Sequence, residues 1–471
     1  MSIQFARASA KSVPVYFATP GSWPALRKSL PASIGALADR QGFEAKPAQV
    51  LLAQVDGKPG FAVVFGAPEN NGSATSGSGA DALAYGKMVE ALPAGDYHFA
   101  NEPHGGLAGL ETAATAWMLA AYSFDLYRKK PKVFPQLVAP KGVDTARVLR
   151  LAGSVHLARD LINTPANDLG VSALTAAALE VARTYKAKTR VIKGEQLLKQ
   201  NFPLIHAVGR AGADAPALID IRWGRARAPK VTLVGKGVCF DTGGLDLKPA
   251  AAMLMMKKDM GGAAVALAIA RAIMDAKLDV NLRLLLPVVE NSVAGNAFRP
   301  GDVYPSRKGI TVEIGNTDAE GRLILAEALT LGDDDAPDFM FDFATLTGAA
   351  RVATGPDLPS FFCNDDVTAD AMVQTGLDIA DPVWRMPLWK PYEAMLSSKI
   401  ADTNNVSSGP FAGAITAALF LQKFTGKAKA WGHFDLYAWT PPGKTGRPEG
   451  AEGQCVRLVY KFLEDRFGRK S

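Results

Sequence analysis

The chain has 471 residues, of which 48% are hydrophobic and 21% charged, a composition typical of a folded protein and not of a disordered one. This length exceeds that of one ordinary core, so we expect two domains. The 52 basic residues nearly balance 46 acidic ones, and the lack of basic clustering disfavours a nucleic-acid-binding surface.

The three cysteines, Cys239, Cys363 and Cys455, are few, odd in number and far apart. This pattern favours a reducing compartment over a disulfide framework. Residues 1–23 lack the apolar core of a signal peptide, and no run of about 18 apolar residues predicts a membrane span. We therefore expect a cytoplasmic protein that has no membrane partner.

Short apolar runs alternate with helical periodicity along the chain. Strands are expected at residues 49–55, 61–65, 231–234, 282–289, 310–314 and 339–344. Helices are expected at residues 107–127, 145–161, 174–186, 262–276 and 323–331. This alternation predicts an α/β protein with a central mixed, mostly parallel sheet flanked by helices. Residues 70–79 have the composition of a flexible loop.

A domain boundary is expected near residues 130–144, which are rich in proline and lysine and separate two helical patterns. We predict a smaller N-terminal α/β domain over residues 1–140 and a linking helix over residues 141–165. Residues 166–471 would form the larger, catalytic α/β domain, because nearly all potential catalytic side chains follow the boundary.

Familiar catalytic motifs are absent from the sequence. It contains no Gly-x-Ser-x-Gly elbow, no His-Glu-x-x-His helix and no Walker A loop. The five histidines are scattered and there is no Cys-x-x-Cys pair, which disfavours histidine and thiolate metal sites. Any metal would have to be held mainly by carboxylates.

One candidate segment, residues 231–264, joins an apolar strand to a glycine-rich stretch that carries Lys236, Asp241, Lys248 and Asp259. Sites in open α/β sheets form beyond the carboxyl ends of strands, so these side chains are well placed for function. The alternative is a solvated loop with ordinary surface charges, which fits any one of these residues taken alone.

A second candidate segment, residues 309–331, has Asp318, Glu320 and Arg322 at alternate positions between a strand and a helix. In an extended backbone these three side chains would point to one side, and Gly321 would let a ligand approach closely. The alternative is a helix start decorated with acids. That alternative does not explain Arg322, whose charge is unfavourable there unless an anion binds.

Together the segments offer four carboxylates as ligands, those of Asp241, Asp259, Asp318 and Glu320. If these groups converged they would repel one another, and two divalent cations about 3.5–4 Å apart would offset nearly all of their charge. Mn or Zn suits this set of ligands, and Mg or Co is also compatible with it.

The octapeptide Asn316–Leu323 (NTDAEGRL) resembles the signature of the leucyl aminopeptidase or cytosol aminopeptidase family, peptidase family M17. The resemblance covers about the last 310 residues in order. It also includes residues 234–244, 258–264, 290–291, 299–302, 344–349 and 413–415. It implies a metal-dependent enzyme that releases N-terminal amino acids, Leu and similar residues preferred, from peptides.

The resemblance also assigns roles to single residues. The two metal ions would be held by Lys236, Asp241, Asp259, Asp318 and Glu320. Lys236 would bind as a neutral amine, because a neighbouring dication can displace its proton. The ions would polarise the scissile carbonyl and activate the attacking water, while the free α-amine of the substrate lies near Asp259.

Three further roles follow from the resemblance. Lys248, kept protonated, would stabilise the oxyanion. A bicarbonate ion held by Arg322, Gly321 and Leu346 would act as general base, which supplies the anion that Arg322 requires. The pocket for the first side chain would be lined by Met256, Thr345 and Gly348.

The chain departs from the family pattern at several positions. Cys239 replaces a usual Thr and could make the site sensitive to oxidation, and Asp246 replaces a small polar residue. Residues 437–440 replace usual small residues and could alter the substrate pocket. We expect His433 to be structural.

Two alternatives compete with, or add to, a peptidase function. A two-metal phosphoryl hydrolase would need a basic phosphate clamp, which the sequence lacks. An added DNA-binding or regulatory role is compatible with a pI near 9.0, and steeply salt-dependent duplex binding would support it. The resemblance further implies a homohexamer with the catalytic domains towards the centre.

Overall fold

The computed structural model of the chain describes residues 3–55, 60–69 and 79–468, so most of the loop expected at residues 70–79 lies outside the described residues. The chain divides into two compact units. Unit 1 comprises Met1–His156, Gly376–Asp381 and Thr440–Glu449. Unit 2 comprises Leu157–Thr375, Pro382–Trp439 and Gly450–Ser471. The functional division at residues 140 and 165 stays a prediction.

Unit 1 is an α/β layer structure. Its described part holds a five-stranded sheet ordered β2-β3-β1-β4-β5, in which only the β2–β3 pair is antiparallel. The strands are β1 Val13–Ala18, β2 Val50–Gln54, β3 Phe61–Gly66, β4 Asp96–Phe99 and β5 Gln136–Leu137. The helices are α1 Trp23–Ser29, α2 Ala32–Gln41, η2 Gly79–Gly86, α3 Lys87–Ala91 and α4 Leu107–Ala120.

Helix α4 ends earlier than residue 127, where the sequence pattern placed its end. The side chains of Ser123 and Asp125 bond to one another, and Asp125 also accepts from the backbone N–H of Lys132 (3.1 Å). Short polar side chains of this kind compete with helical hydrogen bonds, which explains why the helix stops.

Unit 2 is built on a large mixed sheet. Among the described residues it has nine strands, ordered β15-β14-β17-β13-β8-β10-β7-β6 with β9 beside β10. The strands are β6 Lys188–Lys193, β7 Ala217–Gly224, β8 Lys230–Gly235, β9 Gly237–Asp241, β10 Asn281–Asn291, β13 Phe339–Ala344, β14 Ser360–Cys363, β15 Trp384–Arg385 and β17 Ala430–Asp435. The central pairs β17–β13, β13–β8 and β8–β10 are parallel. The expected fold class, with a mostly parallel central sheet, is confirmed.

The described residues also form two short sheets and further helices. Two short sheets are formed by β11 Val303–Pro305, β12 Thr311–Glu313 and β16 Thr403–Asn404, and by β18 Trp439–Thr440 and β19 Gly450–Ala451. The remaining helices are α5 Thr145–Asn163, α6 Val171–Thr184, α7 Gln196–Lys199, α8 Pro203–Gly209, α9 Ala250–Met253, η3 Met256–Met260, α10 Gly261–Ala276, α11 Glu320–Asp333, α12 Gly348–Thr354, α13 Asp366–Asp378, η4 Lys390–Leu396, α14 Gly413–Gln422 and α15 Val456–Phe467.

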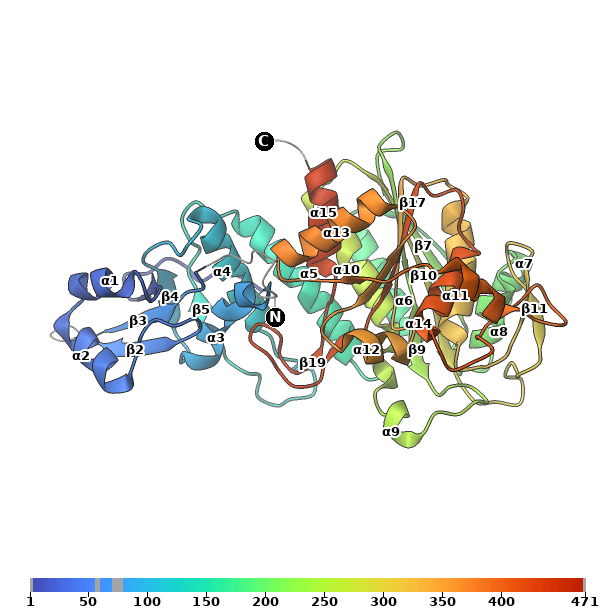
Figure 1. The fold of residues 1–471 in the computed structure, drawn as a ribbon, viewed down its shortest axis with the longest axis horizontal. Helices are drawn as coiled ribbons and strands as arrows, with labels where there is room; N and C mark the ends of the chain where they lie inside the picture. Colours follow the sequence, from blue (N-terminus) through green and yellow to red (C-terminus); the bar gives the residue numbers. More distant parts are fainter. Residues whose placement is uncertain (1–2, 56–59, 70–78, 469–471) are drawn as a thin grey trace. The chain divides into compact units, whose positions relative to one another are not determined.

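Helices cover both faces of the large sheet. Figure 1 shows α10 and α15 on one side of the strands, and α11 and α14 on the other. Helix α10 is buried along nearly its whole length, as expected for an apolar helix packed on a sheet. Among the described residues no helix combines the length and hydrophobicity needed to cross a membrane.

The start of α10 approaches the sheet closely at Gly262. A Cβ atom at this position would lie 2.0 Å from the carbonyl oxygen of Phe343 at the end of β13. The backbone of Lys236, just after β8, bonds on both sides of this contact, because its N–H donates to Phe343 O (3.0 Å) and its carbonyl accepts from Ala263 N–H (2.8 Å). Glycine at position 262 therefore allows the first turn of α10 to fix the backbone of Lys236.

His433 is part of the core, as the sequence analysis expected. It is fully buried in β17, and its Nδ1 lies 2.5 Å from Asp342 Oδ1 on the neighbouring strand β13. Burial opposes the charge of the imidazole, but Asp342 raises the pKa of His433 above its ordinary value. Trp431 Nε1 donates to the other oxygen of Asp342 (2.9 Å). These contacts give His433 a structural role.

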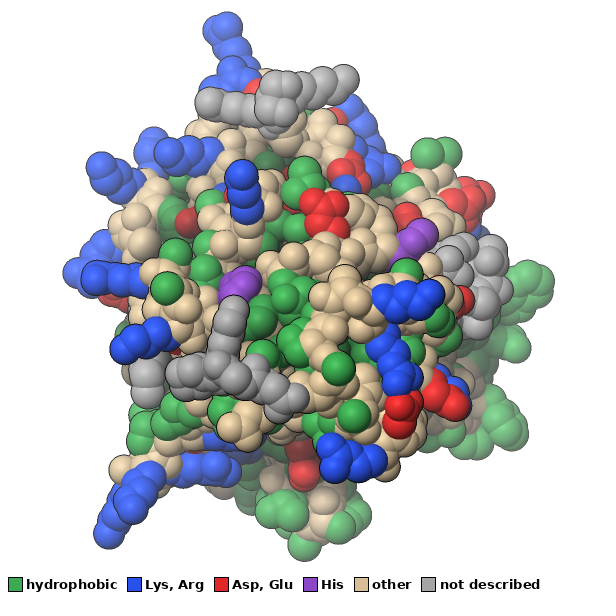
Figure 2. Space-filling view, turned by 90° about the vertical axis from the view of Figure 1, so that its left-hand side faces the viewer, with side chains coloured by type: hydrophobic (Ala, Val, Ile, Leu, Met, Phe, Trp, Pro, Cys, Tyr) green, Lys and Arg blue, Asp and Glu red, His purple; other side chains and the backbone are tan. Residues whose placement is uncertain are grey.

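Basic side chains are dispersed on the face of the molecule seen in Figure 2. The Lys and Arg side chains project from several separate places, with acidic and apolar side chains between them. The described residues on this face therefore form no continuous basic surface of the kind that binds duplex DNA.

We expect Gly262→Ala to lower the free energy of unfolding by about 2–3 kcal/mol, because the added methyl group forces α10 and β13 apart. Gly295→Ala is the control, since a Cβ there meets no heavy atom within 4 Å. The free energy of unfolding of the control, measured by urea unfolding, should stay within about 0.5 kcal/mol of that of the parent protein. Equal stability of the two variants would contradict the close approach.

Candidate functional site

Polar side chains gather where the central strands end. Lys236 follows β8, Asp241 ends β9, Asn291 ends β10 and Thr345 follows β13. The carboxyl ends of parallel strands meet at one edge of a sheet, so these residues become neighbours although they span more than a hundred positions. The placement expected for Lys236 and Asp241 is the placement found.

Three carboxylates converge at this edge. Asp241, Asp259 on η3 and Glu320 at the start of α11 each offer one oxygen, and these oxygens lie within 4.8 Å of one another. All three residues are buried, none with more than 3% of its surface exposed. Asp318, in the turn before α11, is more exposed and joins the group through Lys248.

Lys236 stands between two of the carboxylates. Its Nζ lies 2.6 Å from Asp259 Oδ2 and 2.9 Å from Glu320 Oε1, and it donates to the backbone oxygen of Thr345 (3.0 Å). Burial lowers the pKa of Lys236, but Asp259 and Glu320 raise it more, so the pKa stands above its ordinary value. Without a cation the geometry thus favours the protonated amine.

Gly321 is required by this arrangement. A Cβ at position 321 would lie 2.6 Å from Lys236 Cε, so any larger residue would displace the lysine from its path over the first turn of α11. The sequence analysis attributed this glycine to the approach of a ligand. The structure shows an additional reason, which is the path of the Lys236 side chain.

Lys248 joins the two remaining carboxylates. Its Nζ lies 2.9 Å from Asp241 Oδ2 and also contacts Asp318 Oδ1. Burial lowers the pKa of Lys248, but Asp241 and the bond to Asp318 raise it further, and it ends above its ordinary value. This lysine is therefore a permanent cation at neutral pH.

The carboxylates themselves are difficult to ionise together. Burial and the charge of Asp241 raise the pKa of Glu320 to about 8 and that of Asp318 to about 6. Glu320 Oε2 has no hydrogen-bond partner among the described residues. Buried carboxylate oxygens that lack donors are hard ligands in need of positive charge, so the residues present fit divalent cations.

The expectation that Asp318, Glu320 and Arg322 lie at alternate positions of an extended backbone is wrong. Helix α11 begins at Glu320, so Glu320 and Arg322 belong to its first turn. The turn before the helix is closed by Asn316, whose Oδ1 accepts from the N–H of Asp318 (2.7 Å). Asp318 and Glu320 therefore reach the site from this turn and from the first turn of α11, and not from a strand.

Arg322 is a buried cation at the start of a helix. It is 8% exposed, its Nη1 donates to the backbone oxygen of Asn405 (2.7 Å), and its Nε has no partner among the described residues. Burial lowers the pKa of Arg322 to about 10. The structure thus retains the conflict between its charge and the helix dipole noted from the sequence.

Asp435 is a residue that the sequence analysis did not assign to the site. Its Oδ1 accepts from the N–H groups of Leu346 (3.0 Å) and Thr347 (3.1 Å), and its Oδ2 accepts from Thr347 Oγ1 (2.6 Å). It ends β17, the strand next to β13, and this position at the same sheet edge could have indicated it. The Leu346 amide, expected to hold an anion, thus already has a carboxylate acceptor.

The residues expected to line a pocket lie on three neighbouring elements. Met256 begins η3, Thr345 follows β13 and Gly348 begins α12. Thr345 Oγ1 donates to Asp259 Oδ1 (2.7 Å), which connects this group to the carboxylates. A Cβ at Gly348 would meet no heavy atom within 4 Å, so open space lies beside it.

Two asparagines brace the site. Asn291 Nδ2 donates to Asp241 Oδ1 (2.8 Å) and to the backbone oxygen of Thr317 (3.1 Å). Asn405 holds the turn before α11 through the N–H of Gly315 (2.7 Å). Asn291 ends an expected strand, whereas nothing in the sequence around Asn405 marks it.

The two departures from the family pattern nearest the site are explained by local contacts. Asp246 Oδ2 accepts from the N–H of Thr317 (2.7 Å), which ties the loop after β9 to the turn before α11. Cys239 is 1% exposed, and burial raises the pKa of its thiol. A buried, protonated thiol reacts slowly, so the structure opposes the expected sensitivity to oxidation.

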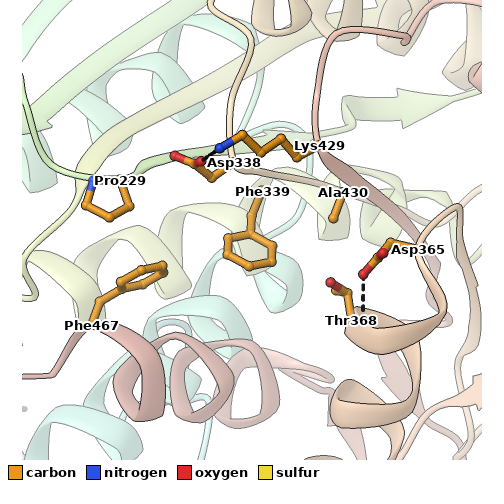
Figure 3. A pocket seen from close by; sticks show the side chains of 8 residues that line it. All are labelled: Pro229, Asp338, Phe339, Asp365, Thr368, Lys429, Ala430 and Phe467. Carbon is orange, nitrogen blue, oxygen red and sulfur yellow. Dashed lines mark hydrogen bonds and ion pairs between the residues drawn. The ribbon is translucent and has the colours of Figure 1, made fainter.

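A hollow lies at the opposite edge of the same strands. This cavity of about 350 Å³ is lined by residues that precede or begin β8, β13 and β17, and also by residues at the start of α13 and the end of α15 (Figure 3). Its charged groups are already paired, because Lys429 Nζ lies 2.6 Å from Asp338 Oδ1, and Asp365 accepts from the N–H of Thr368 (2.8 Å). The edge that carries the carboxylates is therefore the better candidate site.

Comparisons with known proteins point to one family. The catalytic domain of the cytosol aminopeptidase family matches residues 156–460. A probable cytosol aminopeptidase of Roseiflexus castenholzii is 42% identical over 332 residues, which are 69% of this chain and 67% of that protein. The resemblance expected from the sequence is confirmed.

Solved structures agree with this result over nearly the whole chain. A cytosol aminopeptidase from Coxiella burnetii has a TM-score of 0.91 and 41% identity, and the match covers 98% of both chains. The bottromycin maturation enzyme BotP in complex with Mn has a TM-score of 0.86 and 31% identity, covering 97% of this chain and 100% of that one.

The raised pKa of Glu320 predicts how stability changes with pH in chelator-treated protein. Between about pH 4.5 and 8 the folded protein retains a proton on Glu320 that the unfolded chain has lost. The free energy of unfolding should therefore fall as the pH rises through this window. In Glu320→Gln the free energy of unfolding should fall less steeply with pH. In the exposed control Glu180→Gln it should fall with pH as steeply as in the parent protein. Parallel slopes in urea unfolding for all three proteins would contradict the shift.

Proposed function

The chain belongs to the cytosol aminopeptidase family, and we propose that it releases N-terminal amino acids, Leu and similar residues preferred, by two-metal hydrolysis. The observation that supports this most is the convergence of Asp241, Asp259 and Glu320 at the sheet edge, within 4.8 Å of one another. The half-buried Met256 and the open space beside Gly348 support a pocket for an apolar side chain.

We propose that two divalent ions, Mn or Zn, bind at this edge. When bound, they would polarise the scissile carbonyl and lower the pKa of the attacking water. The ligands would be Lys236, Asp241, Asp259, Asp318 and Glu320. The unpartnered Glu320 Oε2 and the raised pKa values of Glu320 and Asp318 support this assignment, because cations would supply the charge that these groups lack.

The other residues of the site would act on the substrate. Lys248, a permanent cation with Nζ 2.9 Å from Asp241, is placed to stabilise the oxyanion that forms at the carbonyl. Asp259, oriented by Thr345 Oγ1 at 2.7 Å, would receive the free α-amine. A free α-amine is present only at an N-terminus, so this contact would restrict cleavage to the first residue.

A bicarbonate ion would serve as general base beside Arg322. The Nε of Arg322 has no partner among the described residues, which supports an anion at this point. The first-turn N–H groups around Gly321 would add to it. The Leu346 amide would contribute less, because it donates to Asp435 (3.0 Å).

We further propose a cytoplasmic homohexamer. The names of relatives as cytosol aminopeptidases support the compartment, and the three buried free cysteines agree with it. The hexamer follows from the family resemblance of the sequence.

Hydrolysis of leucine p-nitroanilide tests the main proposal. We expect activity that a chelator abolishes and that Mn or Zn restores. Lys248→Ala and Asp318→Ala should each lose at least about a hundredfold in kcat. Lys199→Ala, on the exposed surface of α7, should retain activity. Full activity of both site variants would exclude this mechanism.

Light scattering tests the assembly. We expect a mass about six times the 49.8 kDa of one chain. A single-chain mass at micromolar concentration would contradict the hexamer and leave the chemistry of the site unaffected.

A further inference from the structure

Lys258 is a buried cation for which the mechanism provides no role. It lies on η3 beside Asp259 and is 5% exposed. Among the described residues its Nζ has no hydrogen-bond or ion-pair partner, and its contact is with the ring of Tyr437, whose centroid lies 5.2 Å away. A largely enclosed lysine that lacks a protein acceptor is costly to charge, so this position needs a reason.

The carboxylates nearest to Lys258 are occupied by other groups. Asp259 places Oδ2 2.6 Å from Lys236 Nζ and accepts from Thr345 at Oδ1 (2.7 Å). Asp435 accepts from Leu346, and from Thr347 at both of its oxygens. Neither carboxylate is within ion-pair distance of Lys258. Burial lowers the pKa of Lys258 to about 8, and the charges of Asp259 and Asp435 oppose this shift only in part. Lys258 thus has no carboxylate partner among the described residues, and its amine is available to a carboxylate of a bound molecule.

The surroundings of Lys258 place it beside the proposed pocket. Met256 lies two residues earlier on η3. Tyr437, which is half-buried, also contacts the guanidinium of Arg351 on α12, with 4.8 Å between the guanidinium carbon and the ring centroid. Tyr437 thus bridges η3 and α12, the elements that begin with Met256 and Gly348. The wall of the pocket at this point is aromatic and positively charged.

The neighbouring Lys257, in contrast to Lys258, has a hydrogen-bond acceptor within the protein. Its Nζ donates to the backbone oxygen of Asn163 (2.7 Å) and lies 5.7 Å from the ring of Trp439. It therefore has an acceptor within the protein. Lys257 and Lys258 share one short helical turn and one side-chain type, so they form a matched pair for an experiment.

We propose that Lys258 binds the side-chain carboxylate of an acidic N-terminal residue, so that the pocket accepts Glu beside Leu. This inference rests on the proposed aminopeptidase function. Met256 and the Tyr437 ring would contact the aliphatic stem of the substrate side chain, and the ammonium would pair with its carboxylate. Arg351 would add to the positive potential, which disfavours N-terminal Lys and Arg.

The test compares kcat/KM for Glu, Gln and Leu p-nitroanilides in the parent enzyme, Lys258→Met and Lys257→Met. We expect the Glu-to-Leu ratio to fall at least about tenfold in Lys258→Met, which corresponds to about 1.4 kcal/mol. In Lys257→Met the ratio should change less than about twofold. The Gln-to-Leu ratio should fall less than the Glu ratio, because Gln offers an acceptor without charge.

Hydrolysis of the Leu substrate with an unchanged Glu-to-Leu ratio in Lys258→Met would overturn this inference alone. Equal falls for Glu and Gln would overturn the role of charge. Failure of the parent enzyme to hydrolyse any of the three substrates would contradict the proposed function and this inference with it.

Thermal unfolding supplies a readout that does not depend on catalysis. Lys258→Met removes a buried charge that lacks an acceptor, so its Tm should rise by about 2 °C or more. A lower Tm than that of the parent protein would show that the ammonium is already satisfied within the fold, which would contradict the inference.

Discussion

The ammonium group of Lys236 holds together parts of the chain that are far apart in sequence. It contacts Asp259 at 2.6 Å and Glu320 at 2.9 Å, and its side chain crosses Gly321 so closely that no Cβ fits there. Its backbone is bonded to the end of β13 and the start of α10. The positions of η3, α10 and α11 relative to the sheet edge therefore depend on one lysine, and the carboxylate cluster exists because these elements meet around it.

The charges of the cluster explain why it suits cations. Four carboxylates and two ammonium groups, those of Lys236 and Lys248, would leave a net charge of about −2 if all were ionised. Burial and the charge of Asp241 raise the pKa of Glu320 to about 8, so the folded chain can relieve part of this excess by retaining a proton on Glu320. Divalent ions would relieve it more completely, and they would also allow Lys236 to give up its proton. The same cluster is thus compatible with a state in which its carboxylates are partly protonated and with a state in which it binds divalent ions.

Much of this arrangement could be predicted from the sequence, because strand ends are visible as apolar runs that stop at polar residues. That pattern located Lys236 after β8 and pointed to the four carboxylates as ligands, and the family resemblance added Lys236 to the ligand set. The predicted extended geometry of Asp318, Glu320 and Arg322 was wrong. Charged residues at every second position over only five residues are compatible with a strand and also with a turn followed by a helix. Local sequence patterns do not reveal contacts between residues that are far apart in the chain. Asp435 and Lys258 were therefore not identified as site residues from the sequence.

All three thiols of the chain are enclosed. Cys239, Cys363 and Cys455 are at most 5% exposed, and burial raises the pKa of the first two. A maleimide reagent would therefore find no accessible sulfur in the native fold, so its rate of attachment measures how often the core opens. A single cysteine added on the surface would take up a fluorophore selectively, without removal of any natural one.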